Sequence, residues 1–467
     1  MKLLYHSRFR EELEQIIGPV AFKNMELSFR CVNESVIPIM QEENALVTEY
    51  EKLLASAKID WDGEILNLSL LGPYLKHKDP EVRRRAYEKQ NAFFMGIADK
   101  LDELYDKLVK NRTRQAKELG FESYTELGYL RMQRNSYQRE QVENLRRQVK
   151  EVFVPFAESL YENRRERLGL DKMYFSDEQV YGKDGNPQPF GTPEEILEAG
   201  QKMYGELSKE TREFFDFMME NELLDVFGRK TKAVGGYMTY IPDYKSPFIF
   251  ANFNGTSDDV NVITHECGHA FQGYLASEDL FGSMLISVWR LQRSIPCQWS
   301  FSRSLVSSVF AGVKAEAYRE MHLEDAVLFI PYGCMVDEFQ HRVYDDPDMT
   351  PKERKAVWKE LEKTYKPHLD YGSLQFFAEG GYWQRQHHIY SFPLYYIDYV
   401  IAQLCAFEFK NKMQENYEEA WKSYLQLCRL SASDYFENLL RKAGLRSPFE
   451  DGCIQEIVDK LKKDITR

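Results

Sequence analysis

Two histidines with a glutamate beside the first are the residues of this chain best suited to catalysis. They lie in "THECGHAFQGY", residues 264–274, where His265 and His269 stand four positions apart. On a helix this spacing puts both imidazoles on one face, one turn apart. Both rings can then bind one metal ion at about 2.0–2.1 Å, the distance typical of zinc. The motif therefore predicts a zinc site with these two histidines as ligands, and zinc needs a third protein ligand from elsewhere.

The glutamate of the motif suggests the reaction. Glu266 lies beside the two-histidine face, so its carboxylate can contact a water molecule that the metal activates. It would take a proton from that water and pass it to a leaving amine, which makes it a general base for peptide hydrolysis. Cys267 has no neighbouring base, and we interpret it as a small buried filler rather than a nucleophile.

The elements that position these residues are mostly helical by their apolar spacing. Residues 79–121 predict a long helix, with Asp79 as a possible cap and one buried stripe formed by Phe93, Ile97, Leu101, Leu104 and Leu108. Residues 140–170 predict a similar helix with a break or kink at Pro155, and residues 192–227 predict two more helices. Residues 233–256 differ, because a glycine pair and two prolines precede the β-rich run "FIFANF". This stretch predicts a strand or hairpin directly before the motif helix. The fold class is therefore mainly α with a small β-hairpin or sheet.

Composition excludes several functions. The chain has 467 residues with 61 Lys and Arg against 74 Asp and Glu, a net charge of -13, which disfavours nucleic-acid binding. No apolar run approaches the roughly 18 residues that a membrane span needs. Seven scattered cysteines without a CxxC pair indicate reduced thiols. The beginning of the chain does not have the pattern of a signal peptide, so we expect a cytoplasmic protein.

The longer stretch "FIFANFNGTSDDVNVITHECGHAFQGY" resembles the zinc-motif region of oligoendopeptidase F and its Pz-peptidase relatives, in the thimet oligopeptidase superfamily. Further similar stretches follow in the family's order: "SAKIDWDGE", "GGYMTYI", "LFIPYGCMVDEFQHRVYDDP", "GGYWQRQHHIYSFPLYYIDY" and "AGLRSPFEDG". The resemblance implies a large helical zincin-like peptidase fold with a deep groove. It also implies short peptides as substrates and one zinc ion per chain.

The resemblance also implies roles for residues outside the motif. The segment "HHIYSFPLYYIDY" resembles the family's substrate-facing segment. His388 and a tyrosine among Tyr395, Tyr396 and Tyr399 would donate hydrogen bonds to the oxyanion of the tetrahedral intermediate. On spacing alone, these aromatic residues would be ordinary core or groove lining.

A glycine-rich stretch before the motif is a second candidate for contact with substrate. Gly235, Gly236 and Tyr237 resemble a stretch beside the family's groove, where the backbone pairs with an extended peptide. A plain hairpin with tight-turn glycines is the structural alternative. The remaining histidines His322, His341 and His368 show no metal spacing, and we interpret them as structural or surface residues.

One departure from the family concerns the third zinc ligand. The family takes it from a glutamate about 24 residues after the second histidine, where this chain has Arg293. A guanidinium stays charged and has no lone pair to donate to zinc. No acid occurs from 281 to 315, and Glu278 and Asp279 are the nearest acids after the motif.

A reading-frame slip would explain this departure. Allowed codons for Gln292–Ser302, read in the neighbouring frame, give "EIHSMSMEFL", which resembles the family's third-ligand segment. We hypothesise that residues 281–313 are an out-of-frame segment, and the gene sequence tests this. The family also begins with roughly ninety further residues of helix, within the size of a domain, so we expect a shortened N-terminal part. The expected parts are an N-terminal helical part, 1–190, and a catalytic part, 191–467.

The sequence therefore predicts a zinc-dependent metalloendopeptidase that hydrolyses short oligopeptides. The alternative is a catalytically impaired relative that lacks the third ligand and at most binds peptides. Another HExxH class, such as a carboxypeptidase, is disfavoured by the flanking likeness. The sequence does not indicate an oligomeric state.

Overall fold

The computed structural model describes residues 2–188, 192–229, 232, 236–253, 257–276, 313–430 and 433–465. Helices account for most of them, which confirms the mainly α class. Two compact units divide the chain: the motif unit, residues 1–25, 187–326 and 398–467, and the helical unit, residues 26–186 and 327–397. The expected division at residue 190 stays a prediction. In the described part of the chain, no helix has the length and apolar character of a membrane span.

The motif unit combines helices with a three-stranded sheet. Its elements are α1 (Lys2–Tyr5), α2 (Arg10–Ile17), α11 (Pro193–Leu207), α12 (Lys209–Glu220), β3 (Leu224–Phe227), β4 (Tyr237–Ile241), η3 (Pro242–Tyr244), β5 (Ser246–Phe253), α13 (Ser257–Ala276), α21 (Tyr417–Leu430), α22 (Phe436–Lys442) and α23 (Cys453–Ile465). The strand order is β3-β5-β4, with β3 parallel and β4 antiparallel to β5.

The central strand β5 forms because its residues suit a half-buried sheet. Ile249, Ala251 and Phe253 are buried, and the residues between them are only partly buried. This alternation is typical of a strand with one face on a core. Phe250 pairs with Tyr237 on β4, and their rings stack with centroids 5.2 Å apart. The prediction of a strand or hairpin before the motif helix is confirmed.

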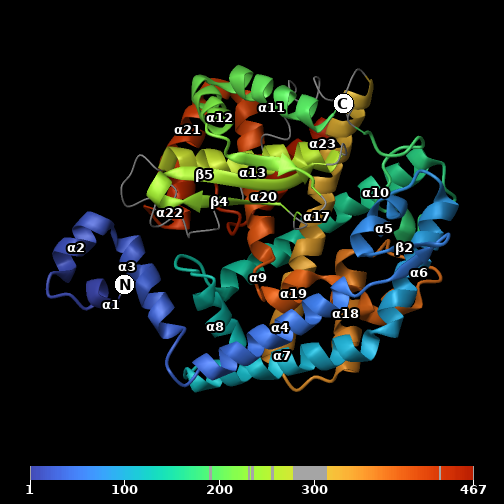
Figure 1. Ribbon diagram of the computed structural model, residues 1–467, viewed down its shortest axis with the longest axis horizontal. Coiled ribbons are helices and arrows are strands. Elements are labelled where there is room, and N and C mark those ends of the chain that lie inside the picture. Colours follow the sequence, from blue (N-terminus) through green and yellow to red (C-terminus); the bar gives the residue numbers. More distant parts are fainter. Residues whose placement is uncertain are drawn as a thin grey trace. The chain divides into compact units, whose positions relative to one another are not determined.

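Helix α13 lies at the centre of the motif unit's packing. It contacts β4 and β5 as well as α11, α12 and α21 (Figure 1). Phe271 on its buried face packs edge-to-face on Phe214, with centroids 5.4 Å apart. Gly200 on α11 allows a close approach, because a Cβ there would lie 2.7 Å from Cδ1 of Ile263. These contacts fix the rotation of α13 about its axis.

The helical unit consists of helices and one short hairpin. Its elements are α4 (Ile37–Ala55), β1 (Ile59–Trp61), β2 (Glu64–Leu66), α5 (Leu68–Leu75), α6 (Pro80–Gly96), α7 (Ala98–Glu118), α8 (Tyr124–Arg131), α9 (Arg139–Gln148), η1 (Val149–Phe153), α10 (Val154–Leu168), η2 (Phe175–Asp177), α18 (Pro351–Tyr365), η5 (Phe377–Gly381), η6 (Tyr382–Arg385) and α19 (His387–Ser391). The division between the units falls within α3 (Pro19–Arg30) and α17 (Val313–Asp345) and at the start of α20 (Ile397–Glu415).

The single helix expected over 79–121 is two helices. Asp79 caps α6 as expected, because its Oδ1 accepts a hydrogen bond from the Glu81 amide at 2.9 Å. The helix ends at Gly96, and α7 begins after Ile97, whose φ of -116° is not helical. The break changes the helical phase, so Phe94 rather than Phe93 faces the core. The prediction of one continuous apolar stripe is therefore wrong at this point.

The break expected near Pro155 is a wide helical turn. Residues Val149–Phe153 form a π-helical turn between α9 and α10, and Pro155 lies in the first turn of α10. Proline has no N–H to donate to the preceding turn, so a helix adjusts its hydrogen bonding just before it. The prediction is confirmed.

Candidate functional site

His265 and His269 lie on α13 with their rings turned toward each other. The ring centroids are 4.7 Å apart with planes at 87°, and the two Nε2 atoms are 3.2 Å apart. Two nitrogens on a tetrahedral zinc ion, each at 2.0–2.1 Å, would be about 3.3 Å apart. The two imidazoles therefore fit one edge of a zinc coordination sphere. Without a metal, the same separation is that of a hydrogen bond between one protonated and one unprotonated nitrogen.

The two histidines lie on the less buried face of α13. Cys267 is fully buried, whereas His265, Glu266 and His269 are only half-buried. The Tyr204 hydroxyl donates to the Ile263 carbonyl at 3.1 Å and ties this turn of α13 to α11. Burial raises the pKa of the Cys267 thiol, an effect that a hydrogen bond with Tyr204 offsets only in part. A thiol in this state is a poor nucleophile, in agreement with the interpretation of Cys267 as a filler.

The structure does not complete a zinc ligand set. Among the described residues, no cluster of three or more His, Cys, Asp and Glu side chains could hold a metal ion. Glu278, Asp279 and Arg293 lie outside the described residues, and so does the proposed frame-slip segment except for its last residue, Val313. Two histidines are thus the ligands that the described structure supplies.

The predicted substrate-facing segment forms an aromatic cluster in the helical unit. His388 is on the short helix α19, and its ring centroid lies 5.2 Å from that of Tyr396 and 6.1 Å from that of Tyr395. The structure therefore brings these three predicted residues together, all half-buried. Tyr399 lies on α20 in the motif unit, where its predicted role stays a prediction.

A hydrogen-bond chain sets the tautomer of His388. The Tyr332 hydroxyl donates to Oε1 of Gln386 at 2.7 Å, and Nε2 of Gln386 lies 3.1 Å from Nδ1 of His388. The amide nitrogen of Gln386 can only donate, so Nδ1 accepts and the neutral ring carries its proton on Nε2. Sequence reasoning missed Gln386, because Tyr332 is 54 positions away and no local pattern joins them.

The glycine-rich stretch leads into an edge strand. Tyr237 begins β4, is 51% exposed, and pairs with β5 on one side only in the described sheet. Gly236 lies beside β5, since a Cβ there would be 3.4 Å from the Phe250 carbonyl oxygen. Gly235 lies outside the described residues. β4 and β5 form a hairpin, but its turn is at Pro242–Tyr244 and contains no glycine, so the alternative of tight-turn glycines does not describe it. An edge strand can pair with a peptide, and this role stays a prediction.

Three other histidines make local contacts. His341 is buried and His322 is half-buried, and desolvation is the main cause of a lowered pKa in both. The His368 ring stacks on Tyr161 at a centroid distance of 3.6 Å, with Nε2 3.2 Å from Glu178. These contacts agree with the structural role expected for them.

A mostly helical fold with an HExxH motif on a helix packed against a small sheet is an architecture of metallopeptidases. Residues 74–459 match the sequence profile of Peptidase family M3, and the chain belongs to this family. The resemblance to oligoendopeptidase F and Pz-peptidase is thereby confirmed.

Solved and curated relatives agree with this assignment. The chain is similar to Pz peptidase A, solved with an inhibitor: identity is 44%, the TM-score is 0.93, and the match covers 100% of this chain and 83% of that one. A Bacillus anthracis str. Ames protein assigned as an oligoendopeptidase F is 39% identical, with a TM-score of 0.87 and coverage of 100% and 81%. Oligopeptidase PepF of Bacillus subtilis (strain 168) is 20% identical over 411 residues, 84% of this chain and 58% of that relative. The chain thus spans 58% of the length of this curated relative.

Proposed function

We propose that this protein is a zinc-dependent metalloendopeptidase that hydrolyses short oligopeptides. The observation that carries the proposal is the 3.2 Å separation of the His265 and His269 Nε2 atoms on α13, with Glu266 beside them. The membership in family M3 supports it. The proposed location is the cytoplasm.

Each residue has a distinct role in the proposed reaction. His265 and His269 would hold Zn²⁺ through Nε2. When bound, zinc lowers the pKa of water to about 7 and polarises the scissile carbonyl. The Glu266 carboxylate takes the proton of the attacking water and delivers it to the leaving amine.

Groups from the aromatic cluster complete the proposal. The Nε2–H of His388 is a donor for the oxyanion, and a hydroxyl among Tyr395, Tyr396 and Tyr399 is a second donor. The backbone of residues 235–237 would pair with an extended peptide. This pairing would favour short, unfolded peptides over folded proteins.

A second candidate function is peptide binding without cleavage. The incomplete zinc ligand set supports this second function, because the described residues add no carboxylate to the two neutral imidazoles of His265 and His269. Two neutral ligands leave the charge of Zn²⁺ uncompensated and weaken its binding. A chain of this kind would retain the peptide-facing groups and lose hydrolysis.

Zinc content and peptide cleavage separate the two functions. We expect purified protein to contain one zinc per chain and to cleave an internally quenched fluorescent peptide. Glu266→Gln should retain zinc and lose at least about 100-fold in kcat, because only the proton transfer is removed. The control Glu213→Gln changes an exposed carboxylate on α12 and should cleave like the wild type. Metal-free protein that binds but does not cleave the peptide would establish the second function.

A peptide blocked at both ends gives an independent test of whether the protein is an endopeptidase. An endopeptidase cleaves a peptide blocked at both ends, whereas a carboxypeptidase needs a free C-terminus. Cleavage of the blocked peptide is therefore expected. A strict requirement for a free C-terminal carboxylate would contradict the proposal.

A further inference from the structure

Leu394 has a backbone conformation that leucine rarely adopts. Its φ is +64°, in the left-handed region, where the Cβ of an L-residue crowds the following carbonyl. Four other non-glycine residues in the described chain have positive φ, but only Leu394 is fully buried. A strained residue of this kind persists only where its surroundings hold it, and such positions concentrate at functional sites. Leu394 directly precedes Tyr395.

Two hydrogen bonds hold the peptide planes on either side of Leu394. Its N–H donates to Oε1 of Gln340 at 2.8 Å, and its carbonyl accepts from Nη2 of Arg134 at 2.5 Å. The angles φ and ψ are the rotations of these two planes about the Leu394 Cα. Each plane is bound to a different buried side chain, so both rotations are set from outside the segment.

The two side chains are themselves fixed. The Gln340 amide donates through Nε2 to the Val336 carbonyl on its own helix at 3.2 Å, so its Oε1 is left facing Leu394. The guanidinium carbon of Arg134 lies 4.2 Å from the centroid of the Tyr129 ring. Both Gln340 and Arg134 are almost entirely buried, which leaves water no access to compete for these bonds.

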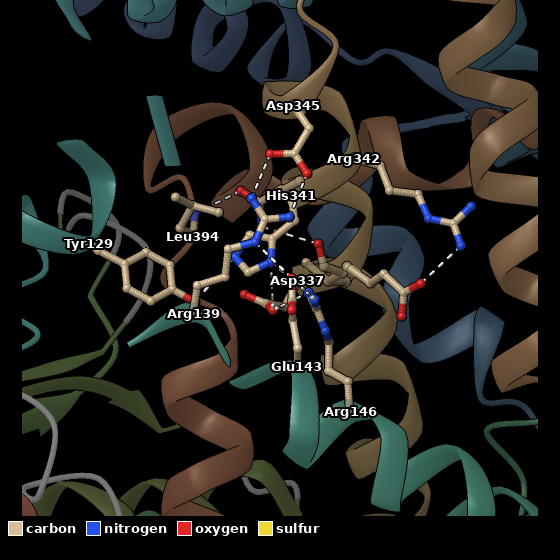
Figure 2. Close-up of polar contacts among 12 residues, drawn as sticks. Tyr129, Arg139, Glu143, Arg146, Asp337, His341, Arg342, Asp345 and Leu394 are labelled. Carbon is tan, nitrogen blue, oxygen red and sulfur yellow. Dashed lines mark hydrogen bonds and ion pairs between the residues drawn. The ribbon is translucent and has the colours of Figure 1, made fainter. Parts of the chain in front are cut away.

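Tyr129 begins a buried polar chain that runs through His341 and Arg146 to Asp337 (Figure 2). The Tyr129 hydroxyl lies 3.3 Å from Nε2 of His341, and Nδ1 of His341 lies 2.8 Å from Nη1 of Arg146. An arginine only donates, so Nδ1 accepts and the neutral ring donates from Nε2 to the tyrosine. Arg146 also pairs with buried Asp337 at 2.8 Å. The support of Leu394 thus continues into a network joining α8, α9 and α17.

The buried Leu394 side chain packs against Gly128 on α8. A Cβ on Gly128 would lie 2.5 Å from Cδ1 of Leu394, closer than two carbon atoms can approach. An alanine at 128 would therefore displace the end of the Leu394 side chain from its place against α8.

We infer that Gln340 and Arg134 are positioning residues, which hold Leu394 left-handed and thereby direct Tyr395 and Tyr396 toward His388. The Leu394 carbonyl belongs to the same peptide plane as the Tyr395 N–H, so the Arg134 hydrogen bond orients the start of the tyrosine pair. The inference rests on the proposed function for its effect on peptide hydrolysis. Its structural part, the placement of Tyr395, can be measured without any activity.

The test combines a spectroscopic and a kinetic readout. Position 395 carries 3-fluorotyrosine, and ¹⁹F NMR reports its surroundings. Gln340→Met removes the acceptor for the Leu394 N–H while keeping a side chain of similar length. Gly128→Ala acts on the same residue by displacing its side chain and removes no hydrogen bond. The control is Gln115→Met, which changes another fully buried glutamine, bonded to Glu43 and Asn111.

Both variants at the Leu394 support should shift the fluorine resonance and lower kcat/KM at least tenfold, mostly through kcat, whereas the control should do neither. In a Leu394→Gly background, where positive φ carries no strain, the loss caused by Gln340→Met should shrink. An unshifted resonance in both variants would overturn the inference, as would a shifted resonance with unchanged kcat/KM. If the two variants shift the resonance but the wild-type protein cleaves no peptide, the positioning stands and the proposed function is refuted instead.

Discussion

Glu362 is a buried carboxyl group whose protonation should control the stability of the protein. It lies on α18 and is 7% exposed. Its Oε1 accepts hydrogen bonds from the Trp358 indole N–H at 2.6 Å and from the Tyr371 hydroxyl. Burial raises the pKa of Glu362 to about 7, and the hydrogen bonds from Tyr371 and Trp358 offset this only partly. Because both donors use Oε1, Oε2 can carry the proton.

Because this pKa is raised in the folded chain, the stability of the protein depends on pH. The ordinary pKa of the group is 4.5, so between pH 4.5 and about 7 the folded chain binds more protons than the unfolded chain. Stability therefore falls as pH rises through this window. The whole difference corresponds to about 3 kcal/mol in the free energy of unfolding.

The variant Glu362→Gln tests this value. Glutamine keeps the Oε1 acceptor and replaces the protonated oxygen with an amide that does not titrate. Urea unfolding, followed by tryptophan fluorescence at several pH values, should find the variant close to the wild type at pH 5. At pH 8 the variant should be more stable than the wild type by about 3 kcal/mol. The control is Glu360→Gln, an exposed carboxylate on the same helix, which should not change the pH dependence.

Equal stability differences at pH 5 and pH 8 would refute the reasoning, because they would mean that Glu362 has the same pKa in the folded and unfolded chain. A variant that is less stable at pH 8 would refute it more strongly. In that case the carboxylate would be charged and well satisfied in the folded protein.

Two further predictions concern packing and charge. Gly200→Ala should destabilise the motif unit by about 1–3 kcal/mol in urea unfolding, because its Cβ would lie 2.7 Å from Ile263. The matched control is Gly72→Ala, where nothing lies within 4 Å of the added Cβ. Equal effects of the two substitutions would contradict the prediction. Lys366→Met should cost about 3–5 kcal/mol at pH 7, because it removes the cation 2.6 Å from the buried carboxylate of Glu178 and leaves the His368 imidazole as its neighbour. Burial alone would raise the pKa of Glu178, but the Lys366 charge and the hydrogen bond with His368 together lower it to about 2. This stabilisation is complete above pH 4.5 and is lost as pH falls toward 2, so urea unfolding at pH 7 and pH 3 should find the variant's deficit clearly smaller at pH 3.

Local patterns were enough to predict much of this fold. Asp79 as a helix cap, the break at Pro155 and the β-rich run at 248–253 depend on neighbouring residues, so the sequence shows them directly. The spacing of His265 and His269 likewise fixes their relation on one helix. Each of these features is decided within one or two helical turns.

Features that depend on distant residues were not predicted. The conformation of Leu394 is held by Gln340, 54 positions away, and by Arg134, 260 positions away. The break at Ile97 shows the same limitation, because a pattern of apolar residues continues across it while the backbone does not. The orientation of His388 depends on Tyr332 through Gln386. Tertiary contacts decide these positions, and no short stretch of sequence contains them.

The π-helical turn at Val149–Phe153 determines the direction in which the side chains of α10 point. A turn of this kind holds one residue more than an α-helical turn, so it rotates later side chains by about 100° relative to an uninterrupted helix. Arg164 places its guanidinium carbon 3.8 Å from the Tyr181 ring centroid from this rotated position. A protein of the same fold with an uninterrupted α-helix here would carry one residue fewer. Such a pair would differ by a one-residue gap near 149–153, and Arg164 would keep its contact despite the change in length.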